Sequence, residues 1–133
     1  MTSEPGTDLA RRIDDIESSY EYLLAYAAQG RQQDLGTEAR TRLQSMFAAL
    51  DGLAGEVRTA LVPTGADTPD DAAPYLAAVE RDAAVARGAL ALVLRRESIS
   101  SMLVDNLNAS VHLRALLTDL FLIEQLTRPQ ERS

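Results

Sequence analysis

The chain contains no cysteine, which excludes disulfide bonds, thiolate nucleophiles and cysteine-based metal or haem sites. It also lacks tryptophan, and its single histidine is His112. A ferritin-like di-metal centre needs Glu-x-x-His pairs on facing helices. One histidine, with Ala109 three positions before it, cannot supply such pairs. We therefore expect no metal and no cofactor.

Positive charge is scarce and carried by arginine alone. The chain has 13 arginines, no lysine and 20 acidic residues, which gives a net charge of −7. The adjacent pairs Arg11–Arg12 and Arg95–Arg96 both have acidic neighbours. Binding to a phosphate backbone needs several clustered cations. We therefore expect no nucleic-acid partner.

Long uninterrupted apolar runs are missing as well. The most apolar region, residues 98–126, carries the polar side chains of Asp105, Asn106, Asn108, Arg114 and Asp119. A transmembrane helix would rarely accept so many. The N-terminal sequence MTSEPGTD is polar and acidic, the reverse of the pattern of a signal peptide. We expect no membrane partner and a cytoplasmic location.

The chain is rich in helical periodicity. No alternating β-branched run occurs, and apolar residues recur at helical spacing in four segments. The pattern predicts an all-α fold, an antiparallel four-helix bundle, because amphipathic helices with short connections pack in this way. The four helices are expected at about residues 8–29, 37–62, 74–95 and 99–127. We expect one domain over residues 1–133, with residues 1–6 and 129–133 frayed.

Punctuating residues and helical phase set the expected boundaries. Gly30 is a suitable stop for the first helix. No glycine or proline separates the third helix from the fourth, but the apolar face would swing by roughly 150° between Leu94 and Ile99. This phase change favours a break near Glu97–Ser100, with Ser98 or Ser100 as the cap. One long helix shared between two subunits would also account for this phase change.

Three of the four tyrosines lie in the first helix, on two different faces. The apolar stripe that we expect in the core consists of Leu9, Ile13, Ile16, Tyr20, Leu23, Leu24 and Ala27. Tyr22 and Tyr26 are four positions apart on a second face. They are either anchors of an interface or rings half-buried against a neighbouring helix.

The fourth helix has more apolar residues than one packed face requires. Such an excess is buried either by the other three helices or by a partner, and homodimers are the commonest oligomers. We expect a homodimer. A protein partner is possible as well. The candidate partner face consists of Tyr22, Tyr26, Leu116, Phe121 and Ile123.

A polar stripe follows the same helix. Its members fall within a sector of roughly 60° on a helical projection: Ser101, Asp105, Asn108, His112 and Asp119. This candidate polar groove is either a ligand site or pH-sensitive contact, or simply the side of the helix that faces solvent. Nowhere does the sequence suggest a nucleophile with a base and an orienting group.

These observations favour a non-enzymatic protein–protein interaction or regulatory module, and no residue is assigned a catalytic role. The alternative is a small-molecule-binding bundle or small enzyme with an interior polar pocket near Asp105, Asn108 and His112.

Overall fold

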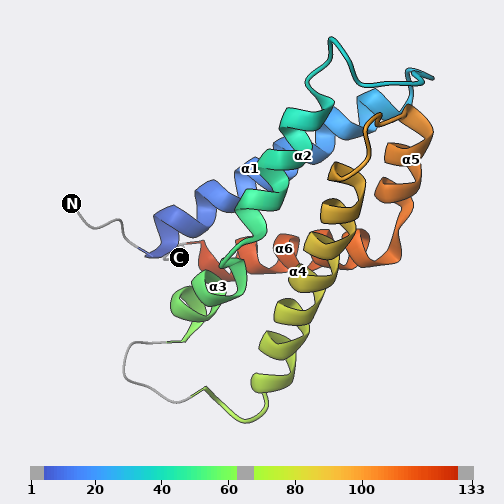
Figure 1. Ribbon diagram of the computed structural model, residues 1–133. Helices are drawn as coiled ribbons and strands as arrows, with labels where there is room; N and C mark the ends of the chain where they lie inside the picture. The colour runs from blue at the N-terminus through green and yellow to red at the C-terminus, as the bar shows by residue number, and fades with distance from the viewer. Residues whose placement is uncertain (1–4, 63–67, 129–133) are drawn as a thin grey trace.

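The structure, a computed structural model, describes residues 5–62 and 68–128 and confirms that the chain is all-helical (Figure 1). Within these ranges there are six α-helices and no strand. The helices are α1 (Pro5–Ala27), α2 (Ala39–Leu50), α3 (Leu53–Leu61), α4 (Ala73–Leu94), α5 (Ser101–Ala109) and α6 (Val111–Thr127). None of them combines the length and the apolarity that crossing a bilayer requires.

The first helix starts earlier than predicted. Pro5 and Gly6, which were expected to fray with residues 1–4, belong to α1. The remaining residues expected to fray, 1–4 and 129–133, lie outside the described ranges. At the other end α1 stops at Ala27, and Gly30 follows with a φ of 67°, a backbone conformation that favours glycine.

The helix predicted over residues 37–62 is two helices, which corrects that expectation. Gly52 separates α2 from α3 and has a φ of 78°, in the left-handed region where other residues are strained. The apolar stripe runs on through the break, since Leu43, Leu50 and Val57 are all buried. Periodicity alone therefore could not reveal the change of direction.

The helix predicted over residues 99–127 is also two helices. Ser110 ends α5 and begins α6, and its hydroxyl accepts a hydrogen bond from the N–H of His112 at 3.3 Å. Serine is a favoured N-cap because its side chain satisfies an N–H that the first helical turn leaves without a partner. Because of this break, the buried residues of α5 and those of α6 would not lie on one face of a single continuous helix.

The predicted break before this segment is confirmed. α4 ends at Leu94 and α5 begins at Ser101, with Ser100 as its N-cap. The hydroxyl of Ser100 accepts a hydrogen bond from the N–H of Leu103 at 3.0 Å. At its other end α4 begins at Ala73, close to the expected start at residue 74, and Pro74 in its first turn needs no helical N–H partner.

α1 and α4 lie on opposite sides of the same four helices, and no contact between the two occurs within the described residues. α1 contacts α2, α3, α5 and α6, and α4 contacts the same four helices. In Figure 1 α6, drawn in red, runs crosswise to α4. The inner face of α6 supplies fully buried side chains to the core: Leu113, Leu116, Leu120 and Ile123. The α1 stripe is buried as predicted at Leu9, Ile13, Ile16 and Leu23, whereas Leu24 is exposed.

An arginine of α1 closes the end of α2. The guanidinium of Arg12 donates to the carbonyl of Ala49 at 3.2 Å and to the carbonyl of Asp51. Asp8 holds that guanidinium in place through a hydrogen bond to Nε at 3.0 Å. The last carbonyls of a helix have no partners within it and carry its negative dipole end, so a neighbouring cation stabilises them.

Candidate interaction surface

The structure disperses the five residues of the candidate partner face. Tyr26, Leu116 and Ile123 are fully buried in the core, so they do not form a surface that a partner can reach. Tyr22 is half-buried, and only Phe121 is exposed. For the three buried residues the expectation is corrected, because packing on several sides of α1 and α6 covers faces that a helical projection leaves open.

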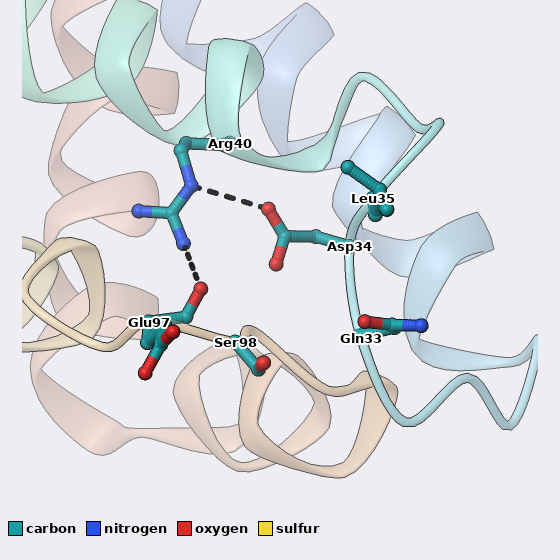
Figure 2. A pocket seen from close by; sticks show the side chains of 6 residues that line it. All are labelled: Gln33, Asp34, Leu35, Arg40, Glu97 and Ser98. Carbon is teal, nitrogen blue, oxygen red and sulfur yellow. Dashed lines mark hydrogen bonds and ion pairs between the residues drawn. The ribbon is translucent and has the colours of Figure 1, made fainter.

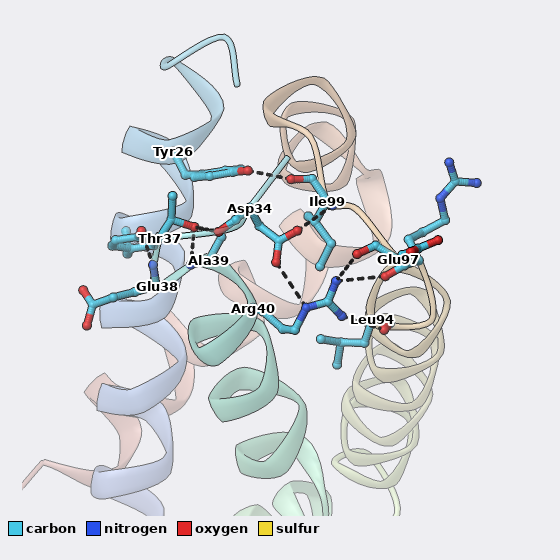
Figure 3. Close-up of polar contacts among 11 residues, drawn as sticks. Tyr26, Asp34, Thr37, Glu38, Ala39, Arg40, Leu94, Glu97 and Ile99 are labelled. Carbon is cyan, nitrogen blue, oxygen red and sulfur yellow. Dashed lines mark hydrogen bonds and ion pairs between the residues drawn. The ribbon is translucent and has the colours of Figure 1, made fainter. Parts of the chain in front are cut away.

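Tyr26 is a buried link between distant segments. Its hydroxyl donates to the carbonyl of Ile99 at 2.5 Å (Figure 3). Burial raises the pKa of the Tyr26 phenol, and the charge of Asp34 adds to the effect. The hydroxyl of Tyr22 accepts a hydrogen bond from the N–H of Glu38 at 2.9 Å. Both rings therefore hold the segments that follow α1 and α4, and neither is an outward anchor.

Two members of the candidate polar groove are buried against α1. The hydroxyl of Ser101 donates to the carbonyl of Tyr26 at 2.7 Å and accepts from the N–H of Arg31 at 2.9 Å. The amide of Asn108 donates to the carbonyl of Leu23 at 3.2 Å. These side chains satisfy backbone groups at the end of α1, where buried polar groups need partners.

The other members of the stripe point elsewhere. Asp105 and His112 are exposed, while Asp119 is half-buried beside α4, where its carbonyl accepts from the hydroxyl of Tyr75 at 3.3 Å. The break at Ser110 shifts the register between α5 and α6, so the five residues do not share one face. Asp105, Asn108 and His112 therefore do not line a common interior pocket.

A polar junction joins the loop after α1 to the end of α4. Arg40, at the start of α2, uses all three guanidinium nitrogens: Nε bonds Asp34 at 3.1 Å, and the other two bond the carbonyls of Leu94, Arg96 and Glu97 at 2.9 to 3.1 Å (Figure 3). The second carboxylate oxygen of Asp34 accepts from the N–H of Ile99 at 2.8 Å. The junction therefore closes α4 as Arg12 closes α2.

A hollow of about 280 Å³ lies beside this junction. Figure 2 shows its lining by Gln33, Asp34, Leu35, Arg40, Glu97 and Ser98. Burial acts to raise the pKa of Asp34, but hydrogen bonds from the backbone and from Arg40 hold it below its ordinary value. Arg40, the arginine that lines this hollow, already binds Asp34 and three backbone carbonyls. The hollow therefore offers no free guanidinium to an anion.

An apolar groove runs between α1 and α6. It is a hollow of about 380 Å³ whose apolar lining consists of Tyr20, Leu24, Leu117 and Phe121. Leu24 is 47% exposed and Phe121 is 54% exposed, although each lies opposite the other's helix. Large side chains left half exposed across one groove are typical of surfaces that bind another molecule. We call this feature the α1–α6 groove.

Acidic side chains border the α1–α6 groove. Asp14, Glu17 and Glu21 of α1 line it, and Glu124 of α6 lies beside Glu17. Burial, the neighbouring carboxyl of Glu124 and the surrounding negative charges raise the pKa of Glu17 to about 7. Within the described residues, the ion pairs involve other carboxylates, those of Asp8, Asp34 and Glu38. We call Asp14, Glu17, Glu21 and Glu124 the acidic rim.

A second pair of carboxyl groups joins α6 to α4. Burial raises the pKa of Asp119 to about 7, and the neighbouring carboxyl of Asp82 adds to this shift. Two carboxyl groups close together cannot both ionise without repulsion, so one keeps a proton at a higher pH.

In the described part of the chain, no group of three or more acidic or histidine side chains is arranged to hold a metal ion.

The sequence carried a partial signal for this surface. Asp14, Glu17 and Glu21 recur at spacings of three and four, so they share one face of α1, and Leu24 lies three positions beyond Glu21. An acidic stripe beside an apolar one is therefore visible in the sequence. The contribution of Glu124 and Phe121 could not be found, because it depends on how α6 lies against α1.

Comparisons of the chain with protein-family models, with curated proteins and with solved structures give no match.

Proposed function

We propose that the chain is a non-enzymatic helical-bundle module that binds another protein through the α1–α6 groove. The observation that carries the proposal is the pairing of Leu24 and Phe121, which are about half exposed on opposite sides of one apolar hollow. Burying such side chains removes apolar area from water at about 25 cal/mol per Å². A partner that covers the groove would gain this free energy.

Two further observations support an interaction role over catalysis. His112 is exposed, and its backbone N–H donates to the hydroxyl of Ser110. Within the described residues its imidazole makes no hydrogen bond. Arg40, Asp34, Ser101 and Asn108 are engaged in holding backbone groups. A catalytic site needs a base and an orienting group beside a reacting group, and these side chains are committed to structure.

The homodimer predicted from the sequence stays a prediction. Two copies that met groove to groove would bring their acidic rims together, and like charges at a contact weaken it. We therefore propose a different protein as the occupant of the groove. The mass of the purified protein in solution, measured over a range of concentrations, decides whether a homodimer also forms.

The proposal is tested by quantitative capture from the native host. Phe121→Ser and Leu24→Ser are compared with Leu92→Ser, a control on α4 where the side chain is 66% exposed and lies outside the groove. We expect one protein to be captured by the wild type and by the control, and to be lost with both groove variants. Equal capture by all four proteins would contradict the proposal.

A further inference from the structure

The acidic rim places negative charge along the border of the α1–α6 groove. Asp14 and Glu21 are exposed, whereas Glu17 and Glu124 are half-buried where α1 and α6 meet. Each of the four belongs to the border of one apolar hollow or lies beside a residue that does. A partner that enters the groove must therefore place its own groups against clustered negative charge.

The pair formed by Glu17 and Glu124 is an unfavourable arrangement in the isolated chain. Its members repel when both are ionised, and Asp14 and Glu21 add to the repulsion. Within the described residues, no arginine forms an ion pair with any of the four. A cation brought by a partner would remove the repulsion and replace the shared proton.

The length of the groove indicates a helical occupant. Its α1 lining extends from Asp14 to Leu24, which are ten helical steps apart, or about 15 Å at 1.5 Å per residue. This is about three turns of a partner helix. An amphipathic helix laid in a hydrophobic groove buries its apolar stripe on the floor and places flanking side chains over the borders.

We propose that the partner's binding segment is a basic amphipathic helix, which packs its apolar face on Leu24, Leu117 and Phe121 and places Arg or Lys side chains against Glu17 and Glu124. This rests on the proposed function and specifies the chemistry of its partner. Charge complementarity selects this occupant over a second copy of the chain, whose net charge is −7. The raised pKa of Glu17 supports it, since a neighbouring cation would displace that proton.

The test uses three synthetic helical peptides, each carrying one tryptophan. The chain itself has no tryptophan, so the indole emission reports on the peptide alone. The first peptide has a leucine-rich face flanked by arginines, the second has glutamine in place of every arginine, and the third keeps the arginines but has serine on the apolar face. Affinities are measured at about 0.05 M and about 0.5 M NaCl, where screening of exposed charges differs strongly.

We expect the first peptide to bind at least about tenfold more tightly than the second at low salt, and the difference to shrink at high salt. The third peptide should not bind measurably. For the double variant Glu17→Gln with Glu124→Gln, the affinity for the first peptide should be no higher than the affinity for the second peptide. Glu80→Gln, an exposed change on α4 outside the groove, is the matched control and should leave all affinities unchanged.

Each contrary outcome has a distinct meaning. Equal affinity for the first two peptides would overturn the basic partner while leaving the groove as a protein-binding surface. Equal affinity for the first and third would overturn the groove as the determinant, because it would show attraction to a negative protein in general. If no peptide binds while capture from the host still depends on Phe121, the inference is wrong and the proposed function stands.

Discussion

The hydroxyl of Tyr26 and the carbonyl of Ile99 meet at 2.5 Å although 73 residues separate them in the chain. The bond lies in the core and joins the last turn of α1 to the residue two positions before α5. A carbonyl buried in this way has no water to bind if its donor is removed. Such a loss costs more than the net value of an exposed hydrogen bond.

Tyr26→Phe tests this link, because it removes the hydroxyl and keeps the ring. We expect the free energy of unfolding to fall by about 1–3 kcal/mol, measured by urea denaturation. Tyr20→Phe is the control: Tyr20 is half-buried, and its hydroxyl has no hydrogen bond within the described residues. A loss of the same size in both variants would show that the bond to Ile99 contributes little.

Arg40→Lys tests the closing of α4. Lysine keeps the charge, but it cannot reach Asp34 and three carbonyls with one planar group as arginine does. We expect a loss of about 2 kcal/mol in the free energy of unfolding. Arg42→Lys is the control, because Arg42 approaches Glu38 only at 4.0 Å and exposed pairs of this kind contribute about 0.5 kcal/mol. Similar losses for both would contradict the role given to Arg40.

Gly52→Ala and Gly55→Ala should change stability in opposite directions. Gly52 has a φ of 78°, so a side chain there is strained, and we expect a loss of about 1–2 kcal/mol. Gly55 lies within α3 with no atom within 4 Å of an added Cβ, so alanine should stabilise the helix by about 0.5–1 kcal/mol. Thermal unfolding of the two variants measures both effects, and a stabilising Gly52→Ala would contradict the break between α2 and α3.

The paired carboxyls predict that stability decreases as the pH rises from about 4 to about 7. Glu17 and Asp119 both have a pKa raised to about 7 in the folded protein. A carboxyl group whose pKa is raised by folding binds its proton more tightly in the folded protein. Its contribution to the free energy of unfolding is therefore fully present below the unfolded pKa and is lost as the pH rises through the folded pKa. The Tm should therefore be several degrees higher at pH 5 than at pH 8.

Variants of the partner residues separate this effect from the rest of the chain. Glu124→Gln and Asp82→Asn each give the remaining carboxylate a neutral neighbour that can donate a hydrogen bond. Together they should flatten the dependence of Tm on pH above pH 5, while Glu80→Gln should not. Below about pH 4 the lowered pKa values of Asp8 and Asp34 act in the opposite direction, because their stabilising contacts with arginine need the ionised carboxylate. A wild-type Tm that rises from pH 5 to pH 8 would refute the assignment.

Helical class, α1, α4 and the break before Ser101 could be predicted because each depends on local signals: amphipathic spacing, a proline in the first turn and a serine cap. The break at Gly52 could not be predicted from apolar spacing, because buried residues continue in phase on both sides. The break at Ser110 changes the buried face, but the excess of apolar residues in this segment hid that change in the sequence. The sequence Asp51-Gly52 was the available local sign, since such pairs favour turns.

The burial of several candidate site residues has a related cause. Ser101 and Asn108 look like an outward polar stripe until α1 supplies the carbonyls that they bind. Tyr26 looks outward on a helical projection, but it is fully buried and its hydroxyl binds the carbonyl of Ile99, before α5. Conversely, Leu24 fits the apolar stripe of α1 but stays exposed, because α6 covers only part of that face. Helical phase identifies which residues share a face, whereas the neighbours decide which faces are covered.

The arginines that close helix ends also bear on how the molecule comes apart. Arg12 on α1 holds the end of α2, and Arg40 on α2 holds the end of α4. Loosening α1 therefore leaves the last carbonyls of α2 without these partners, and loosening α2 does the same to α4. Local opening of a single helix is costly under such an arrangement, and hydrogen exchange of the amides of α1, α2 and α4 should proceed through one shared, nearly global opening.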